Sequence, residues 1–292
     1  MIDFIWPIPP GTKVLPQWTG KEFIRDGNKE RILYYSEYQD SWGAGLTEFH
    51  EENAGQNHFI DIASRRNAIA ELKTFLKVPE PIILEIGSSS GYLLPMIQQA
   101  FPQGLVMGSD SFPDALGRMA GELPGIPLLQ FDLLHCPLHD NSVDALVLLN
   151  VFEHIEEDAK GMAQLYRILK PGGIVVIEVP AGSHLYDIYD ELLMHFRRYD
   201  MGALKEMALS CGFNILRASH LGFFLYPGFY WVKKRNQKHL HKEDVIKKNL
   251  VAGAIANSSN NLPMMWVMAL EFIVGRFVRF PFGTRCLLTL KK

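Results

Sequence analysis

A turn of small residues in the first third of the chain has the composition needed to hold a nucleotide-like ligand. It lies in residues 81–94, which read PIILEIGSSSGYLL. An apolar run leads to Glu85, three serines stand between Gly87 and Gly91, and a helical pattern begins at Leu93. A glycine turn between a strand and a helix lets the backbone approach a ligand, and the helix N-terminus favours negative groups. The segment therefore predicts a site for an adenine nucleotide or a related cofactor.

The pattern E-x-G-x-x-x-G differs from two common phosphate-binding motifs. The dinucleotide fingerprint G-x-G-x-x-G would require glycine at Ser89 and at Tyr92. A P-loop would continue into Gly-Lys-Ser/Thr, which is missing from this stretch of the sequence. A nicotinamide-dependent oxidoreductase therefore stays only an alternative.

Polar residues also follow the next three apolar runs. In a doubly wound sheet, ligands bind at the carboxyl ends of the strands, which is where these residues would lie. The carboxylate of Asp110 suits the two ribose hydroxyls of a nucleoside. Asp132 suits the exocyclic amine of adenine, with Phe131 and Leu133 on either side of the ring. The candidate cofactor contacts are Glu85, Gly87, Ser88, Ser89, Gly91, Asp110, Ser111, Phe131, Asp132, Leu133 and Asn150.

Alternating strands and helices must position these residues. The hydrophobic patterns predict strands at 82–86, 105–107, 127–131, 143–149, 174–179, 213–220 and 284–290. They predict helices at 64–77, 113–120, 159–169 and 201–210. Alternation at this spacing favours a mostly parallel sheet with helices on both faces.

The ordered set of strand-end residues resembles class I S-adenosylmethionine (SAM)-dependent methyltransferases. The resemblance covers about residues 60–220 and rests on the glycine turn, Asp110, Asp132, the D-A-L-V strand that leads to Glu153 and His154, and the LKPGG turn at 169–173. Ser89 stands where glycine is usual in the family. The resemblance implies a Rossmann-like, doubly wound, seven-stranded sheet whose last strand is antiparallel. The residues before that strand predict a helical insertion. It also implies SAM as the cofactor and S-adenosylhomocysteine as the product.

A second pattern, H-x-R-R-Y, follows the fifth strand of the nucleotide-binding fold. His195, Arg198 and Tyr199 belong to a segment that is similar to one in bacterial methyltransferases of quinone, lipid or cell-surface glycan pathways. With His154, they are the candidate catalytic or acceptor-site residues, and the two histidines are the candidate bases. We expect no metal site.

Each candidate also has a structural interpretation. The serines and Asp110 could cap helices, Asp132 could be a turn residue, and His154 could pair with Glu153. His195 and Arg198 could form an internal salt bridge. These alternatives stay open at the level of sequence.

The C-terminal third is rich in aromatic residues. Residues 222–232 read GFFLYPGFYWV, and residues 262–282 predict an amphipathic helix with Glu271 on its polar half and Trp266 on its apolar half. The apolar half is expected to pack on the domain, with a lipid-linked acceptor or peripheral membrane contact as the alternative. The lysines between Lys233 and Lys248 predict a solvated linker.

Composition sets the remaining expectations. The chain has 292 residues and a net charge of −3, which gives no reason to expect nucleic-acid binding. Three scattered cysteines and an N-terminus unlike a signal peptide favour a cytoplasmic protein, which could sit at the inner face of the membrane. The oligomeric state is open.

These patterns predict a division of the chain into four segments and a function in methyl transfer. Residues 1–57 form an N-terminal lid, 58–222 the cofactor-binding domain, 223–282 the insertion and 283–292 the last strand. The resemblance implies methyl transfer by direct displacement to an O, N or C atom of a small or lipid-linked acceptor. A catalytically silent SAM-binding scaffold and an NAD(P)-dependent oxidoreductase are the alternatives.

Overall fold

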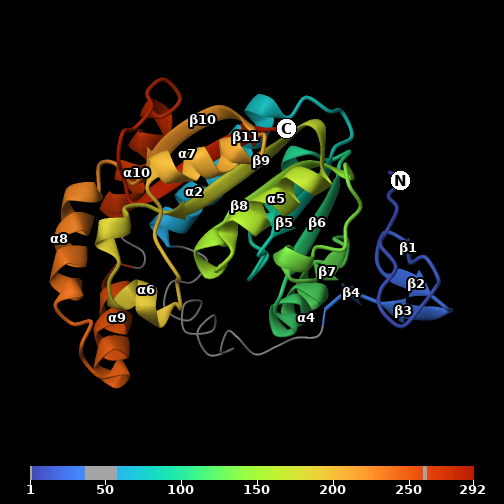
Figure 1. Ribbon diagram of the computed structural model, residues 1–292, viewed down its shortest axis with the longest axis horizontal. Coiled ribbons are helices and arrows are strands. Elements are labelled where there is room, and N and C mark those ends of the chain that lie inside the picture. The colour runs from blue at the N-terminus through green and yellow to red at the C-terminus, as the bar shows by residue number, and fades with distance from the viewer. Residues whose placement is uncertain (1, 37–57, 259–261) are drawn as a thin grey trace.

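The computed structural model describes residues 2–36, 58–258 and 262–292, although the side chains of residues 252–258 are not described. Its centre is an eight-stranded sheet, shown in Figure 1. In order across the sheet, the strands are β10 (Asn214–Leu221), β11 (Arg285–Lys291), β9 (Leu169–Pro180), β8 (Val143–Leu149), β5 (Ile82–Ile86), β6 (Leu105–Asp110), β7 (Leu128–Gln130) and β4 (Ile32–Tyr34). Of these strands, β11 runs antiparallel to both neighbours, as expected for the last strand.

The Rossmann-like α/β class is confirmed, but the predicted number of seven strands is wrong. The additional strand is β4, which pairs in parallel with β7 through Ile32 and Leu128. This short strand pairs with the backbone groups at the open edge of β7, and its side chain Leu33 is buried in the core. The sequence-based boundaries place this run in the N-terminal segment, outside the sheet.

Two layers of helices cover the sheet and bury its two faces in separate apolar clusters. One layer consists of α2 (Phe59–Phe75), α3 (Leu94–Ala100) and α4 (Pro113–Glu122). The other consists of α5 (Asp158–Ile168) and α7 (Met201–Ser210), which lie in front of the sheet in Figure 1. The strand order reverses at β5, which pairs with β6 on one side and β8 on the other. Such a switch point places a ligand-binding crevice beyond the carboxyl end of β5.

Most predicted elements agree with the structure within a few residues. The LKPGG segment differs, because it is part of strand β9 and not a separate turn before it. Residues 169–173 form the first part of β9 as a bulge, since Val143 pairs with Leu169 whereas Ala145 pairs with Ile174. Gly172 has a φ of 81°, which favours glycine. The bulge lets the chain turn from α5 into the sheet without leaving it.

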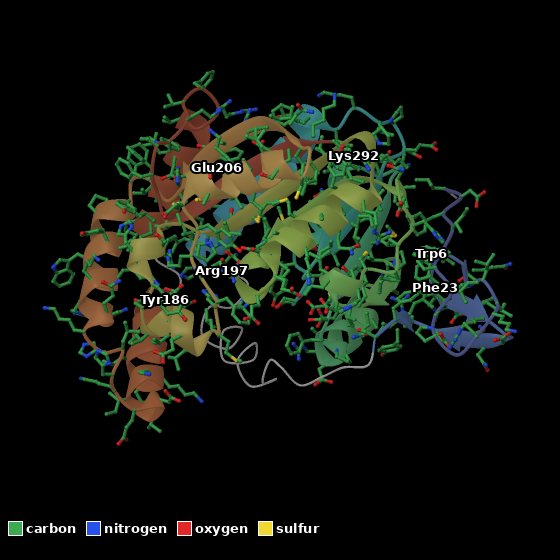
Figure 2. All side chains as sticks on the ribbon, in the orientation of Figure 1. Trp6, Phe23, Tyr186, Arg197, Glu206 and Lys292 are labelled. Atoms are coloured by element: carbon green, nitrogen blue, oxygen red, sulfur yellow. The ribbon has the colours of Figure 1, made fainter. Side chains whose placement is uncertain are left out.

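The described part of the N-terminal segment lies at the edge of the sheet. It forms a small sheet of β1 (Gln17–Trp18), β2 (Phe23–Arg25) and β3 (Asn28–Glu30). Trp6 and Phe23, labelled in Figure 2, meet edge to face with ring centroids 4.8 Å apart and join the main apolar cluster. The expectation of a lid over residues 1–57 stays a prediction, and residues 37–57 lie outside the described part.

Three helices separate β10 from β11, as expected for the insertion. They are α8 (Tyr226–Gln237), α9 (Asp244–Ser258) and α10 (Leu262–Val274). The prediction of one helix through residue 282 is wrong, because α10 ends at Val274. The prediction that the lysines form a solvated linker is also wrong, because Lys233 and Lys247 are buried and paired with acidic side chains.

The predicted orientation of the last of these helices is inverted. Glu271 is 1% exposed, and its carboxylate accepts hydrogen bonds from the backbone amides of Gly222 (2.6 Å) and Phe224 (3.1 Å). Trp266, on the half expected to be buried, is 77% exposed. The unsatisfied amides between β10 and α8 therefore decide which face of α10 turns inward.

Candidate active site

The glycine turn after β5 is held by its neighbour β6. The amides of Gly87 and Ser88 donate to the carbonyl of Ser109 at 2.8 and 2.9 Å, and the Gly91 amide donates to the carbonyl of Ser88 at 2.7 Å. Gly87 and Gly91 have φ values of 72° and 70°. A Cβ atom at Gly87 would stand 2.5 Å from Cγ2 of Val151, so this position requires glycine for space as well as for conformation.

Ser89, where glycine is usual in the family, also adopts a left-handed conformation, with a φ of 46°. Its amide donates to Oδ2 of Asp110 at 2.9 Å, while Oδ1 of the same carboxylate accepts from the Phe112 amide at 3.0 Å. Asp110 thus connects the glycine turn with the loop that leads to α4. Asp110 therefore does more than cap the helix, because its carboxylate also accepts a hydrogen bond from the glycine turn.

Glu85 lies beneath this turn with an unusual carboxyl group. Burial, and then the nearby charge of Asp110, raise its pKa well above the ordinary value. Among the described residues, Oε2 of Glu85 has no hydrogen-bond partner. The guanidinium of Arg65, on α2, opposes this rise in pKa and lies 5.6 Å from the ring centroid of Tyr92. Sequence reasoning missed Arg65, because its sequence position lies well before the glycine motif.

The carboxyl end of β7 carries the residues predicted to contact adenine. Phe131 and Leu133 are buried in the main apolar cluster, and their place on either side of the ring stays a prediction. Oδ1 of Asp132 accepts from the Leu134 amide at 2.9 Å, as its alternative turn role predicts. The carboxylate also lies 3.2 Å from Nδ1 of His135. Ser111, which follows the carboxyl end of β6, is exposed.

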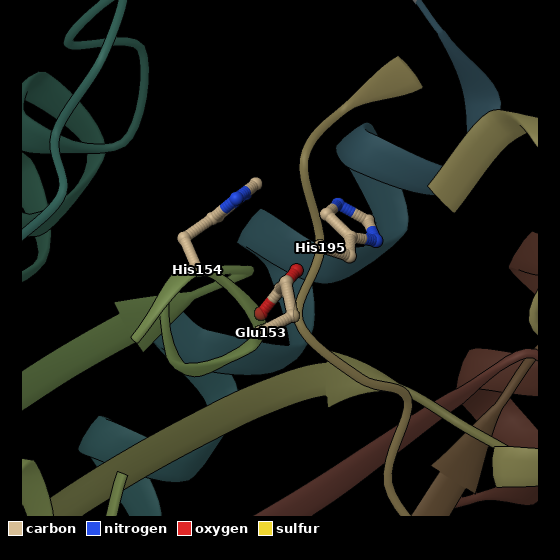
Figure 3. Close-up of side chains that lie close together, drawn as sticks. All are labelled: Glu153, His154 and His195. Carbon is tan, nitrogen blue, oxygen red and sulfur yellow. The ribbon is translucent and has the colours of Figure 1, made fainter. Parts of the chain in front are cut away.

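The turn after β8 carries the candidate residues Asn150 and His154, with Glu153 between them. Asn150 has a φ of 56°, and its amide donates to the carbonyl of Glu178 at 2.8 Å. Glu153 and His154 follow in a 3₁₀ turn, Phe152–His154. Figure 3 shows both side chains directed toward His195 on a facing loop. The rings of His154 and His195 meet edge to face, with centroids 4.7 Å apart.

The H-x-R-R-Y loop is fixed to this turn by several polar contacts. The Phe196 amide donates to the carbonyl of Glu153 at 2.8 Å, and the Tyr199 hydroxyl donates to the carbonyl of Phe152 at 3.0 Å. Arg197, labelled in Figure 2, forms a 2.6 Å ion pair with Asp158. These contacts bring His195 next to Glu153, although the two residues are far apart in the sequence.

Asp190, at the end of this arrangement, was missed by sequence reasoning. Its carboxylate contacts Nδ1 of His195 at 2.9 Å, Arg198 at 2.9 Å and Lys233 at 2.8 Å. Burial acts against ionisation, but Lys233, His195 and Arg198 together lower the pKa of Asp190. Burial lowers the pKa of His195 more than its bond to Asp190 raises it. The imidazole is therefore neutral at neutral pH, with Nδ1 protonated and Nε2 available.

The structure gives Arg198 and Tyr199 partners inside the protein. The Arg198 guanidinium donates to Asp190 and to the carbonyls of Ala181 and Thr284. Tyr199 is 5% exposed and packs in the main apolar cluster. These contacts favour positioning roles for Arg198 and Tyr199. Of the four predicted catalytic residues, His154 and His195 are the two whose rings face each other.

Comparisons with known proteins place a methyltransferase domain in this part of the chain. The methyltransferase domain model matches residues 84–177, which run from β5 to β9. This match and the relatives below support a class I, SAM-dependent methyltransferase. That match includes the glycine turn, Asp110, Asp132 and the turn with Glu153 and His154. It ends before the H-x-R-R-Y loop.

Two curated relatives and one solved structure are similar over this domain. The chain is 30% identical to the demethylmenaquinone methyltransferase of Thermus thermophilus over 47% of this chain and 65% of that protein. It is 27% identical to a "Probable S-adenosylmethionine-dependent methyltransferase" of Mycolicibacterium smegmatis, over 46% and 52% of the respective lengths. The proposed sarcosine dimethylglycine methyltransferase of Galdieria sulphuraria has a TM-score of 0.57 at 16% identity, with 85% and 98% of the chains covered, and so shares the fold. The matched region spans about half to two thirds of the curated relatives.

Proposed function

We propose that this protein transfers a methyl group from SAM, by direct displacement, to an O, N or C atom of a small or lipid-linked acceptor. One observation carries the proposal. The Ser89 amide of the glycine turn is bonded to Asp110 beside the switch point of the sheet, and the turn after the adjacent strand β8 carries His154, which faces His195. This arrangement gives a donor site and an acceptor side at one edge of the sheet.

The residues of the crevice fit the charges of SAM. The donor carries a sulfonium and an ammonium group, and Glu85 and Asp110 supply two acidic neighbours. Oε2 of Glu85 is a buried acceptor without a partner among the described residues, and a cationic ligand would relieve its repulsion with Asp110. Arg65 is a candidate partner for the carboxylate of the donor, since guanidinium groups bind carboxylates in a fork. We retain Ser88, Ser111, Asp132 and Asn150 as candidate contacts.

The chemistry requires little from the protein beyond alignment. The sulfonium, when bound, supplies an activated methyl group, so the chain must orient the acceptor, exclude water and remove a proton where the acceptor has one. His195 suits the last task, because Asp190 holds its Nδ1 and leaves Nε2 to accept the proton. His154 provides a second imidazole on the same side.

The insertion supports an apolar or membrane-bound acceptor. One side of α10 and the following residues exposes large apolar side chains at helical spacing, namely Leu262, Trp266, Leu270, Ile273 and Phe277. Arg276 and Arg279 are exposed beside them. Apolar side chains next to basic ones are typical of contact with an anionic lipid surface. Among the described residues, none of the helices has the length and apolar character required to cross a bilayer. A cytoplasmic protein that touches the inner face of the membrane fits these features.

Titration calorimetry tests the donor part of the proposal. We expect one SAM site per chain, and weaker or undetectable binding of NADH. Folded protein that gives no heat with SAM or S-adenosylhomocysteine would contradict the proposal. A protein that binds SAM but methylates no lipid or quinone in extracts of its own cells would support the scaffold alternative instead.

A further inference from the structure

Three potential metal ligands from two separate segments meet at the acceptor side. Glu153 and His154 belong to the turn after β8, whereas His195 follows the short helix α6 (Ile188–Leu192). One ligand atom from each of the three lies within 4.8 Å of the other two, and Figure 3 shows the side chains directed toward a common space. We propose that Glu153, His154 and His195 bind a divalent transition-metal ion.

The carboxylate of Glu153 is the strongest indication of a ligand. Glu153 is 0% exposed, and neither of its carboxylate oxygens has a hydrogen-bond partner among the described residues. Buried carboxyl groups are normally paired, hydrogen-bonded or bound to a metal, because burial without a partner costs several kcal/mol. The nearest cations are already engaged, since Arg198 pairs with Asp190 and Arg285 pairs with Glu178 and Asp61.

His195 is oriented as metal-binding histidines usually are. Its Nδ1 donates to Oδ1 of Asp190, which leaves Nε2 as the ligand atom. A carboxylate behind a histidine fixes the tautomer and the plane of the ring at many metal centres. Asp190 is itself held by Lys233 and Arg198, so the ring of His195 has little freedom to turn away.

The donor set selects the kind of ion. Two imidazoles and one carboxylate are suited to Zn²⁺, Fe²⁺ or Co²⁺, and three protein ligands leave at least one position open. Mg²⁺ and Ca²⁺ prefer oxygen ligands throughout. Ligand atoms around such an ion stand about 3.3 Å apart, so atoms that lie within 4.8 Å of one another must approach by at most about 1.5 Å.

An ion at this place would also indicate the chemical class of the methyl acceptor. This step rests on the proposed methyl transfer. Its open position would hold a hydroxyl or enolate oxygen and lower the pKa of that group. The acceptor class would then be compounds with an ionisable oxygen at or beside the methylated atom. The ion would in that case act in place of a free His195 base.

Metal binding to the tag-free, chelator-treated full chain tests the site without any acceptor. We expect Zn²⁺ titration to show one ion per chain, and Co²⁺ to give the visible absorption of a low-coordinate site with nitrogen ligands. Glu153→Gln and His195→Gln should each weaken Zn²⁺ binding at least about 100-fold, since loss of a direct ligand exceeds the 10–100-fold effect of an outer-shell change. Glu156→Gln, which alters an exposed carboxylate two residues after the turn, should leave Zn²⁺ binding unchanged.

SAM titration of the same proteins separates the two proposals. Variants that lose Zn²⁺ but keep SAM affinity would support the metal site and show that the fold is intact. If Glu153→Gln does not fold, His154→Gln takes its place, because its side chain is half-buried. Equal Zn²⁺ affinity in wild type, Glu153→Gln and His195→Gln would overturn the proposal, as would binding of Mg²⁺ alone. Zn²⁺ binding without SAM binding would support the site and contradict the proposed function.

Discussion

His195 donates a hydrogen bond from its Nδ1 to Oδ1 of Asp190 at 2.9 Å, and both residues are buried. Through this bond, the imidazole at the acceptor side is connected to an ion network that also includes Arg198, Lys233 and Asp187. Lys233 comes from the insertion, so α8 holds the site together from outside the methyltransferase domain.

Lys233→Met should therefore destabilise the protein by about 3–5 kcal/mol, the usual cost of removing one partner from a buried ion pair. The substitution would leave the carboxylates of Asp187 and Asp190 without their shared ammonium group. Chemical denaturation measures the change in the free energy of unfolding. Lys238→Met, at an exposed position after the same helix, is the control and should have little effect. Equal stability of the two variants would show that the network contributes little.

Replacement of Asp110 should weaken SAM binding. Asp110→Ala removes acceptors for the amides of Ser89 and Phe112 as well as any contact with the ribose. Buried polar groups left without partners cost about 1–3 kcal/mol, which corresponds to a roughly 5–150-fold loss of affinity by calorimetry. Asp110→Asn keeps one carbonyl acceptor and should lose less. Unchanged affinity in both variants would confine Asp110 to a structural role.

SAM binding should release protons. Burial and Asp110 raise the pKa of Glu85 in the free protein, and a cationic ligand favours the ionised carboxylate and lowers that pKa again. Affinity should then increase with pH until it passes the pKa of the free protein, and should fall in acid. Calorimetry in two buffers with different ionisation enthalpies measures the protons released. Glu85→Gln should abolish the release, and a release that persists in this variant would assign it to another group.

Gly87→Ala should disturb the turn that forms the donor site. Its Cβ would meet Val151 at 2.5 Å, and a φ of 72° is unfavourable for alanine. We expect a loss of roughly 1–3 kcal/mol in stability together with weaker SAM binding. Gly117→Ala, in α4, is the control, because its Cβ would meet no atom within 4 Å and alanine favours a helix. Thermal unfolding compares them, and a Gly87→Ala protein as stable as wild type would contradict the steric argument.

The exposed side of α10 should bind anionic membranes. Trp266 and Phe277 are 77% and 85% exposed, and burial of one large side chain in the interface is worth roughly 1.5–3 kcal/mol. Trp266→Ser with Phe277→Ser should reduce co-sedimentation with anionic liposomes and leave the unfolding temperature unchanged. Leu209→Ser, on the exposed part of α7, is the control. Wild-type protein that remains in the supernatant would refute membrane contact through this helix.

The sequence alone determined most of the sheet, apart from β4, and the position of the predicted donor site. Local patterns carry this information: apolar runs define the strands, Gly87 and Gly91 supply positive φ values, and acidic residues at strand ends meet at one edge because parallel strands end there. These features need no knowledge of distant contacts, so β5, β8 and α7 were predicted to within a residue or two.

Tertiary structure decided the acceptor side. Glu153 and His195 become neighbours only when the H-x-R-R-Y loop docks on the turn after β8, and Lys233 reaches Asp190 only when α8 folds back from beyond β10. The direction of α10 was likewise not encoded in its own amphipathic pattern. Glu271 turned inward because two backbone amides of a different segment required acceptors, and the cost of leaving such groups unpaired exceeded the cost of exposing Trp266.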